Sequence, residues 1–292
     1  MKEEGEKRGL PPRLLAFYQR LFRIQAGAER RISTAKSSLK REVVSGRLKH
    51  GLPLIIFDEL ALDWPLLKDT FTKVTATFAD YTDIFGNLPK SLREPTAHPS
   101  LPKKMVKAWF ERANLSSTIA VGDINEYLLL EAIIHATLKP FLVSRSKALI
   151  SLVNQEQWRR SSCPICGCRP DFAFLDKEQG ARWLLCSRCD TEWLFQRLQC
   201  PYCGTQNQDD LTYFTNDEGV YRLYVCEHCH KYIKAIDLRH TESEIMLPLE
   251  RLLTLDMDRQ ARKYGYDDGQ DTKSNNTDLT EKKESVYNAS KT

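Results

Sequence analysis

The chain has 292 residues, of which 41% are hydrophobic and 28% charged, a composition typical of a soluble globular protein with two or three domains. The charged start, Met1–Arg8, precedes no apolar signal segment, and the longest apolar runs, such as Leu52–Phe57, are too short to cross a bilayer. We therefore expect a cytoplasmic protein without a membrane span.

The net charge of +4 is unevenly distributed along the chain. Residues 1–50 hold thirteen Lys or Arg against five Asp or Glu, whereas residues 163–239 hold nine against eleven. Neutralisation of phosphates by basic side chains supplies most of the affinity of a nucleic-acid-binding module. The slightly acidic balance of the second region therefore argues against a nucleic-acid partner.

The first half of the chain is predicted to form an all-α bundle over residues 1–158, because its apolar residues recur at helical spacing. Helices are expected after Pro11-Pro12, across residues 34–49, after Asp63, across 103–114 and after Asp123, with Leu52–Phe57 as a buried connector. Asp63 and Asp123 are candidate N-caps. The expected buried side of the helix after Asp123 is Ile124, Tyr127, Leu128, Ile134 and Leu138.

Two residues of this last helix need comment. Pro140 lacks an N–H and is expected to kink or end the helix, with another segment continuing from Phe141. His135 lies near the buried face and is predicted to be a core histidine rather than a ligand.

All nine cysteines lie between Cys163 and Cys229, and eight of them form four C-x-x-C pairs. Two closely spaced thiolates in such a knuckle can bind one metal from a tight turn, and a closed tetrahedral site needs four thiolates. In the first and third pairs, proline sets φ at the start of the turn, and Gly167 or Gly204 can take the left-handed conformation that ends it. The candidate ligands are Cys163, Cys166, Cys186, Cys189, Cys200, Cys203, Cys226 and Cys229.

The spacing predicts how the pairs combine. Nineteen residues separate Cys166 from Cys186 and twenty-two separate Cys203 from Cys226, intervals that suit a β-hairpin returning a second knuckle beside the first. We therefore expect two tandem ribbons, residues 163–199 and 200–240, each holding one metal. An interleaved pairing of the four knuckles stays open, and spacing alone does not distinguish zinc from iron.

Other interpretations of the cysteines fit less well. Structural disulfides need an oxidising compartment, a thioredoxin-like motif would occur once, and ferredoxin-type clusters have other spacings. Cys168 is expected to be a small buried residue, and His228 and His230 are expected to lie outside the ligand set.

The expected strands are residues 172–175, 182–185, 211–215 and 220–225. A further helix is predicted within residues 241–265, and the polar segment 266–292 is expected to be a disordered tail. The fold class is thus α+β: an N-terminal helical bundle, two tandem rubredoxin-like or zinc-ribbon domains and a C-terminal helix.

No phosphate loop, nucleophile elbow or H-E-x-x-H motif is present in the sequence. A site filled by four thiolates leaves no position for catalytic water. These features favour a binding or assembly protein, not an enzyme.

The cysteine region resembles the FdhE family of formate dehydrogenase accessory proteins. The resemblance rests on C-P-I-C-G at Cys163, C-S-R-C-D-T-E-W at Cys186, C-P-Y-C-G at Cys200 and C-E-H-C-H at Cys226, and extends to Leu10-Pro-Pro in the helical half. It implies a cytoplasmic, non-enzymatic factor that matures formate dehydrogenase, binds its catalytic subunit and carries rubredoxin-like iron. His230 stands where the family commonly has glycine, and Cys168 where serine is common.

Two hypotheses of function follow. The first is this assembly factor, with the catalytic subunit contacting residues beside the knuckles, and the second is a ribbon-containing nucleic-acid or ribosome-associated adaptor. The candidate partner-binding residues, expected to be exposed, are Arg182, Glu192, Trp193, Arg197, Tyr232 and Lys234. The alternative for Trp193 and Tyr232 is packing of one ribbon against the other.

Overall fold

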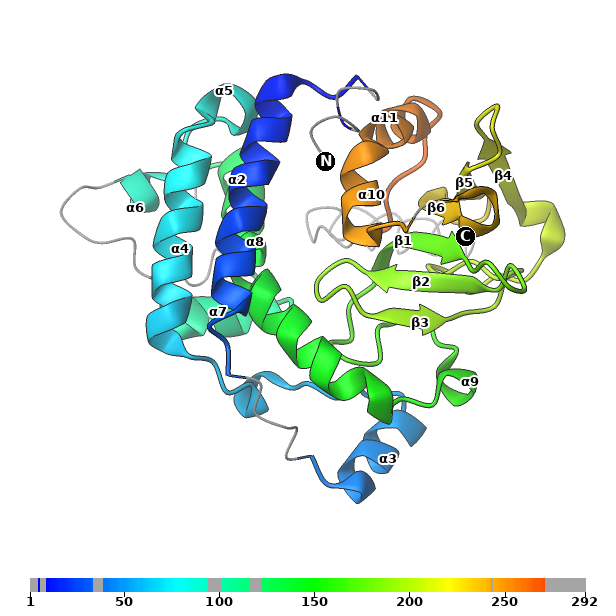
Figure 1. The fold of residues 1–292 in the computed structure, drawn as a ribbon, viewed down its shortest axis with the longest axis horizontal. Helices are drawn as coiled ribbons and strands as arrows, with labels where there is room; N and C mark the ends of the chain where they lie inside the picture. The colour runs from blue at the N-terminus through cyan, green and yellow to red at the C-terminus, as the bar shows by residue number, and fades with distance from the viewer. Residues whose placement is uncertain are drawn as a thin grey trace, which may run out of the picture.

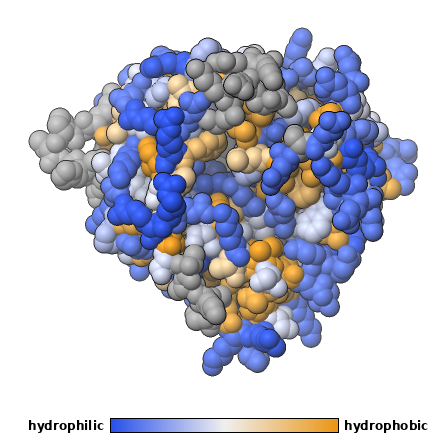
Figure 2. Space-filling model, in the orientation of Figure 1, coloured by the Kyte–Doolittle hydropathy of each residue, from blue (hydrophilic) through white to orange (hydrophobic). Residues whose placement is uncertain are grey.

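The computed structural model describes residues 5, 9–33, 39–93, 101–115, 122–242 and 244–270. Within them the chain forms a helical body and a β-sheet that lie side by side, with two C-terminal helices packed on the sheet (Figure 1). Hydrophilic side chains cover most of the face seen in Figure 2, with apolar patches between them. The predicted α+β architecture is confirmed.

The helical body is built around three helices that pack against one another, α2 (Pro12–Glu29), α4 (Trp64–Ala79) and α8 (Ile124–Leu149). Both predicted caps are present, because the side chains of Asp63 and Asp123 accept hydrogen bonds from the N–H groups of Leu66 and Glu126. The shorter helices are α3 (Arg41–Lys49), α5 (Thr82–Phe85), α6 (Lys90–Arg93), α7 (Lys103–Phe110) and α9 (Gln155–Trp158).

Helix α8 differs from expectation in where it ends and in where its buried side begins. Pro140 was expected to kink or end it, and the helix continues through this residue to Leu149. Proline leaves the carbonyl four residues earlier without its helical donor. Here the Gln25 side chain of α2 donates to that carbonyl, Ala136 O, at 2.9 Å. Ile124 and Leu128 are exposed, so the buried side begins one turn later than expected.

By length and composition alone, residues Ile124–Leu152 could cross a membrane, unlike the apolar runs considered above. However, 56% of the apolar window is buried inside the fold, against α2 and α4. Core helices of soluble proteins pass the same test, and the packing of α8 is that of a core helix.

The strands of the two predicted ribbons form one six-stranded sheet in the order β3-β2-β1-β6-β5-β4. The strands are β1 (Pro170–Leu175), β2 (Arg182–Cys186), β3 (Glu192–Leu194), β4 (Leu211–Thr215), β5 (Tyr221–Cys226) and β6 (Lys231–Asp237). Strands β3 and β6 were not predicted. They follow the returning knuckles, which are the second C-x-x-C pair of each ribbon, Cys186/Cys189 and Cys226/Cys229. Because β1 and β6 pair in parallel, the ribbons share a backbone ladder instead of standing as separate units.

The C-terminal segment contains two helices, α10 (Leu247–Leu253) and α11 (Leu255–Lys263), where one was expected. They cover one face of the sheet, contacting Tyr221, Leu223 and Ile236. Residues 266–270, predicted to belong to the disordered tail, instead pack on the second ribbon, with Asp267 bridged to Lys231. Residues 271–292 lie outside the described part of the chain.

Candidate metal centres

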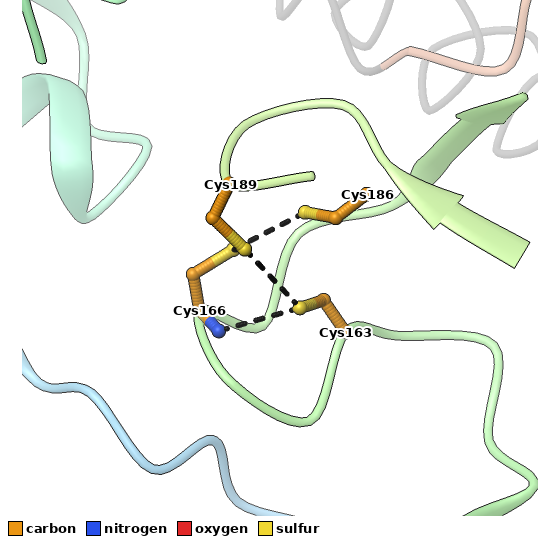
Figure 3. A group of neighbouring side chains, drawn as sticks. All are labelled: Cys163, Cys166, Cys186 and Cys189. Atoms are coloured by element: carbon orange, nitrogen blue, oxygen red, sulfur yellow. Dashed lines mark hydrogen bonds between the residues drawn. The ribbon is translucent and has the colours of Figure 1, made fainter. Parts of the chain in front are cut away.

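The first centre brings together Cys163, Cys166, Cys186 and Cys189, whose Sγ atoms all lie within 4.8 Å of one another. The two knuckles come from the loop before β1 and from the turn between β2 and β3, which the β1–β2 hairpin places side by side. Figure 3 shows the four thiols pointing toward a common centre. All four side chains are buried.

The second centre repeats this arrangement with Cys200, Cys203, Cys226 and Cys229, again within 4.8 Å. Its knuckles precede β4 and join β5 to β6. Unlike the first centre it lies at the surface, because Cys203 is exposed and Cys229 half-buried. The grouping of cysteines in both centres is the one expected from the spacing, and not the interleaved one.

The geometry fits one tetrahedral metal ion in each centre. The Sγ–Sγ separations are 3.4–3.6 Å between cysteines of the first centre and 3.7 Å in the second. Metal–sulfur bonds of about 2.3 Å in a tetrahedron place sulfurs about 3.8 Å apart, whereas a disulfide joins them at about 2.0 Å. Backbone N–H groups of Ile165, Arg188 and Tyr202 point at knuckle sulfurs and stabilise thiolates.

The knuckle turns have the predicted backbone. Gly167 and Gly204 have φ of 74° and 80°, the left-handed conformation that leaves the turn. The returning knuckles use the same conformation without glycine, at Asp190 (φ 52°) and His230 (φ 53°). His230 therefore occupies a position that glycine adopts with less strain.

The pKa values of the cysteines explain why a bound cation is required for all four thiols of a centre to ionise. Burial raises the pKa of Cys163 well above its ordinary value, and it raises the pKa of Cys226 to about 11. At Cys203, hydrogen bonds from the Thr205 N–H and neighbouring thiols outweigh burial and lower the pKa to about 7. Four thiolates therefore do not form together without a bound metal, and binding one releases protons.

The helical body holds the first centre from two sides. The connector 52–57 donates from the N–H groups of Leu54 and Ile55 to the carbonyls of Pro164 and Ile165, at 2.9 and 2.8 Å. On the other side, the Arg188 guanidinium lies 4.0 Å from the centroid of the Trp109 ring and donates to two carbonyls at the end of α7. These contacts explain why this centre is buried.

An ionic cluster beside the first centre was missed by sequence reasoning. Asp190, directly after Cys189, accepts hydrogen bonds from Lys139 of α8 (2.6 Å) and from Arg251 of α10. Arg251 also contacts Asp171 at 2.9 Å and donates to the Cys186 carbonyl. Burial raises the pKa of Asp190, but Lys139 and Arg251 outweigh it and hold that pKa below its ordinary range.

The remaining sequence candidates lie outside the ligand sets. Cys168 is buried beside the first knuckle, as expected, and His228 and His230 are exposed. His135 stacks on Trp109 inside the helical body, and burial lowers its pKa to about 3, so the imidazole is neutral.

Most of the candidate partner-binding residues are not exposed, contrary to expectation. Trp193 is buried in the main core and donates to Arg160 O, and the buried Tyr232 and Lys234 bond to Asp258 of α11. Arg182 is buried and donates to the carbonyls of Gln196 and Gln199. Arg197 and Glu192 are exposed. The buried residues support the sheet from inside, where a partner does not reach them.

Comparison with known proteins points to one family. Residues 162–197 match the model of the FdhE central domain. The FdhE homolog of Aquifex aeolicus is 30% identical over 241 residues, which cover 80% of this chain and 78% of that one. The chain belongs to the FdhE family. The FdhE homolog of Haemophilus ducreyi is 38% identical over 81 residues, 26% of each chain.

The fold agrees with that assignment. The crystal structure of the FdhE protein from Pseudomonas aeruginosa matches 84% of this chain and 83% of its own, with a TM-score of 0.52 and 20% identity. The chain therefore shares its overall architecture with a solved member of the family.

Removing one knuckle tests whether the centres load separately. We expect Cys163→Ser/Cys166→Ser to lower the metal content from about two ions to one per chain, because two thiolates do not hold the ion. Cys200→Ser/Cys203→Ser should lose the other ion, and Cys168→Ser should keep both. Elemental analysis of purified protein measures this, and loss of both ions from a folded variant would contradict separate loading.

Proposed function

We propose that this protein is a cytoplasmic, non-enzymatic accessory factor that assembles or activates formate dehydrogenase and binds its catalytic subunit. Membership of the FdhE family carries the proposal, because the similarity to the A. aeolicus homolog extends over both the helical body and the cysteine region. The two four-cysteine centres support it, since sites closed by four thiolates fix a binding surface and leave no position for catalytic water.

We further propose iron in at least one centre, as the family resemblance implies. Tetrahedral sulfur sites accept zinc or iron, so the residues alone fit both. When bound, the ion supplies rigidity, and iron also supplies one-electron redox chemistry. The metal content and absorption spectrum of anaerobically purified protein decide between them.

A genetic and biochemical test follows. Cells lacking this gene should lose most of their formate oxidation, and the tagged full-length protein should co-purify with the catalytic subunit after nuclease treatment. Nuclease treatment removes any association through RNA or DNA, which the slightly acidic cysteine region does not favour. Full formate oxidation without the gene, together with no co-purified subunit, would instead support the nucleic-acid or ribosome adaptor.

A further inference from the structure

A groove of about 490 Å³ lies between residues 197–199 at the end of the first ribbon and strands β4 and β5 of the second, on the sheet face opposite α10 and α11. We call it the ribbon groove and define it by Arg197, Leu198, Tyr213, Arg222, Tyr224 and Lys231. On this sheet face, Ala173 and Leu184 of the first ribbon and Ile233 and Ala235 of β6 are covered by the main core. The part over β4 and β5, where Tyr213 lies, is open.

The floor and wall of the ribbon groove are apolar and uncovered. Tyr213 of β4 pairs with Tyr224 of β5, and their ring centroids lie 5.4 Å apart. Tyr213 is 48% exposed, and Leu198 across the groove is 57% exposed. Large apolar side chains gathered in a concave site favour an occupant with apolar side chains of its own.

Apart from Cys200 and Cys226 of the second metal centre, the charged or ionisable side chains that line the ribbon groove are basic or tyrosines, and several of their donor atoms lack an acceptor among the described residues. Four basic side chains line it, with no Asp or Glu among the lining residues. Arg222 pairs with Asp237 through Nη2, but the buried Nε atoms of Arg182 and Arg222 and the Tyr224 hydroxyl have no hydrogen-bond partner within the described chain. A buried donor without an acceptor is costly. These atoms are buried, so the carboxylates of an occupant would pair with the exposed Arg197 and the half-buried Lys231 and bring negative charge close to the buried donors.

The net charge of the second ribbon favours an occupant with few negative charges. Residues 200–240 hold four Lys or Arg against six Asp or Glu, so this ribbon is slightly acidic although the groove lining is basic. A nucleic acid requires many basic contacts for its affinity, and this ribbon offers few beyond the lining. A peptide segment with one or two carboxylates beside apolar residues fits both the lining and the net charge.

We propose that the ribbon groove binds a segment of the partner protein that combines acidic and apolar side chains. The proposal rests on the proposed function for the identity of that partner, the catalytic subunit of formate dehydrogenase. Carboxylates of the segment pair with Arg197 and Lys231, for which no ion pair is found among the described residues, and an apolar side chain covers Tyr213.

The test measures binding of the purified catalytic subunit to the metal-loaded full chain. Arg197→Glu/Lys231→Glu is expected to weaken binding at least about tenfold, and Tyr213→Ala similarly. Phe214→Ala is the matched control, because Phe214 is 55% exposed and adjacent on β4 but faces away from the groove. Lys177→Glu/Arg259→Glu, at two exposed positions outside the groove, controls for net charge. Each variant must keep two metals per chain.

Wild-type affinity in the groove variants, or an equal loss in the controls, would overturn the proposal. Removing residues 271–292 should leave affinity unchanged, and tighter binding without them would mean that this segment of the chain occupies the groove instead.

A second probe separates this proposal from the proposed function. If the wild-type chain does not bind the catalytic subunit, the proposed function fails, and the groove is judged with a fluorescent twelve-residue peptide of alternating Asp or Glu and Leu or Phe. That peptide should bind the wild-type chain and the Phe214→Ala variant with similar affinity. Its affinity for the Tyr213→Ala variant should be at least about tenfold weaker. Equal binding of the peptide to the wild-type chain and both variants would refute the groove proposal. Binding of oligo-dT that is lost in Arg197→Glu/Lys231→Glu would also refute it.

Discussion

Chelation is expected to release the two metals at rates that differ by at least about tenfold, with the second centre emptying first. A chelator attacks an ion only through an accessible ligand. Cys203 is exposed and Cys229 half-buried in the second centre, whereas all four cysteines of the first are buried under the connector and α7. Opening the first centre therefore requires local unfolding, and each 1.4 kcal/mol of opening free energy slows release about tenfold.

The measurement is zinc release from the zinc-loaded protein, followed with a coloured chelator. Two phases of one ion each are expected. Cys203→Ser/Cys229→Ser should remove the fast phase, and Cys163→Ser/Cys166→Ser the slow one. Leu54→Pro offers a further check, because it removes the N–H that donates to Pro164 O and should speed the slow phase alone. A single phase for both ions, or a slow phase assigned to the second centre, contradicts the expectation.

Local signals predicted much of the fold. The helix caps at Asp63 and Asp123 were identified because a capping aspartate acts on the next turn of its own chain. The grouping of the cysteines was likewise accessible, since a hairpin of about twenty residues returns one knuckle to the other. In both cases the contact lies close in sequence.

What sequence reasoning missed involves residues far apart in the chain. The parallel pairing of β1 with β6 joins segments about sixty residues apart, and no local pattern fixes such a register. Lys234 was expected to be exposed because lysine usually faces water, yet it pairs with Asp258 of α11 inside the fold. The helix at Pro140 continues because Gln25, from another helix, supplies the missing donor.

Replacing Arg251 with methionine is expected to lower the free energy of unfolding by about 3–5 kcal/mol. Arg251 contacts Asp171 at 2.9 Å and also pairs with Asp190, and all three side chains are largely buried. Methionine keeps much of the volume but leaves the buried Asp171 without its cation, and Asp190 keeps only its ion pair with Lys139. A buried charge that loses its partner costs far more than an exposed one.

The effect should also reach the first metal centre. Arg251 donates to the Cys186 carbonyl, and Asp190 follows Cys189, so the returning knuckle is held by this cluster from both ends. We therefore expect Arg251→Met to speed metal release from the first centre while leaving the second unchanged. Arg251→Lys keeps the positive charge but loses the planar guanidinium group with its several donors. It should therefore lose less stability than Arg251→Met.

Arg262→Met is the matched control for this change. Arg262 lies in α11, and its ion pair with Asp268 joins two exposed side chains at 3.3 Å. Exposed pairs contribute up to about 1 kcal/mol, so this variant should unfold nearly as the wild type does. Urea unfolding of the metal-loaded proteins compares them. If Arg251→Met and Arg262→Met lose equal stability, the cluster is not what holds the returning knuckle, and the contacts of the connector and Arg188 alone must keep the first centre closed.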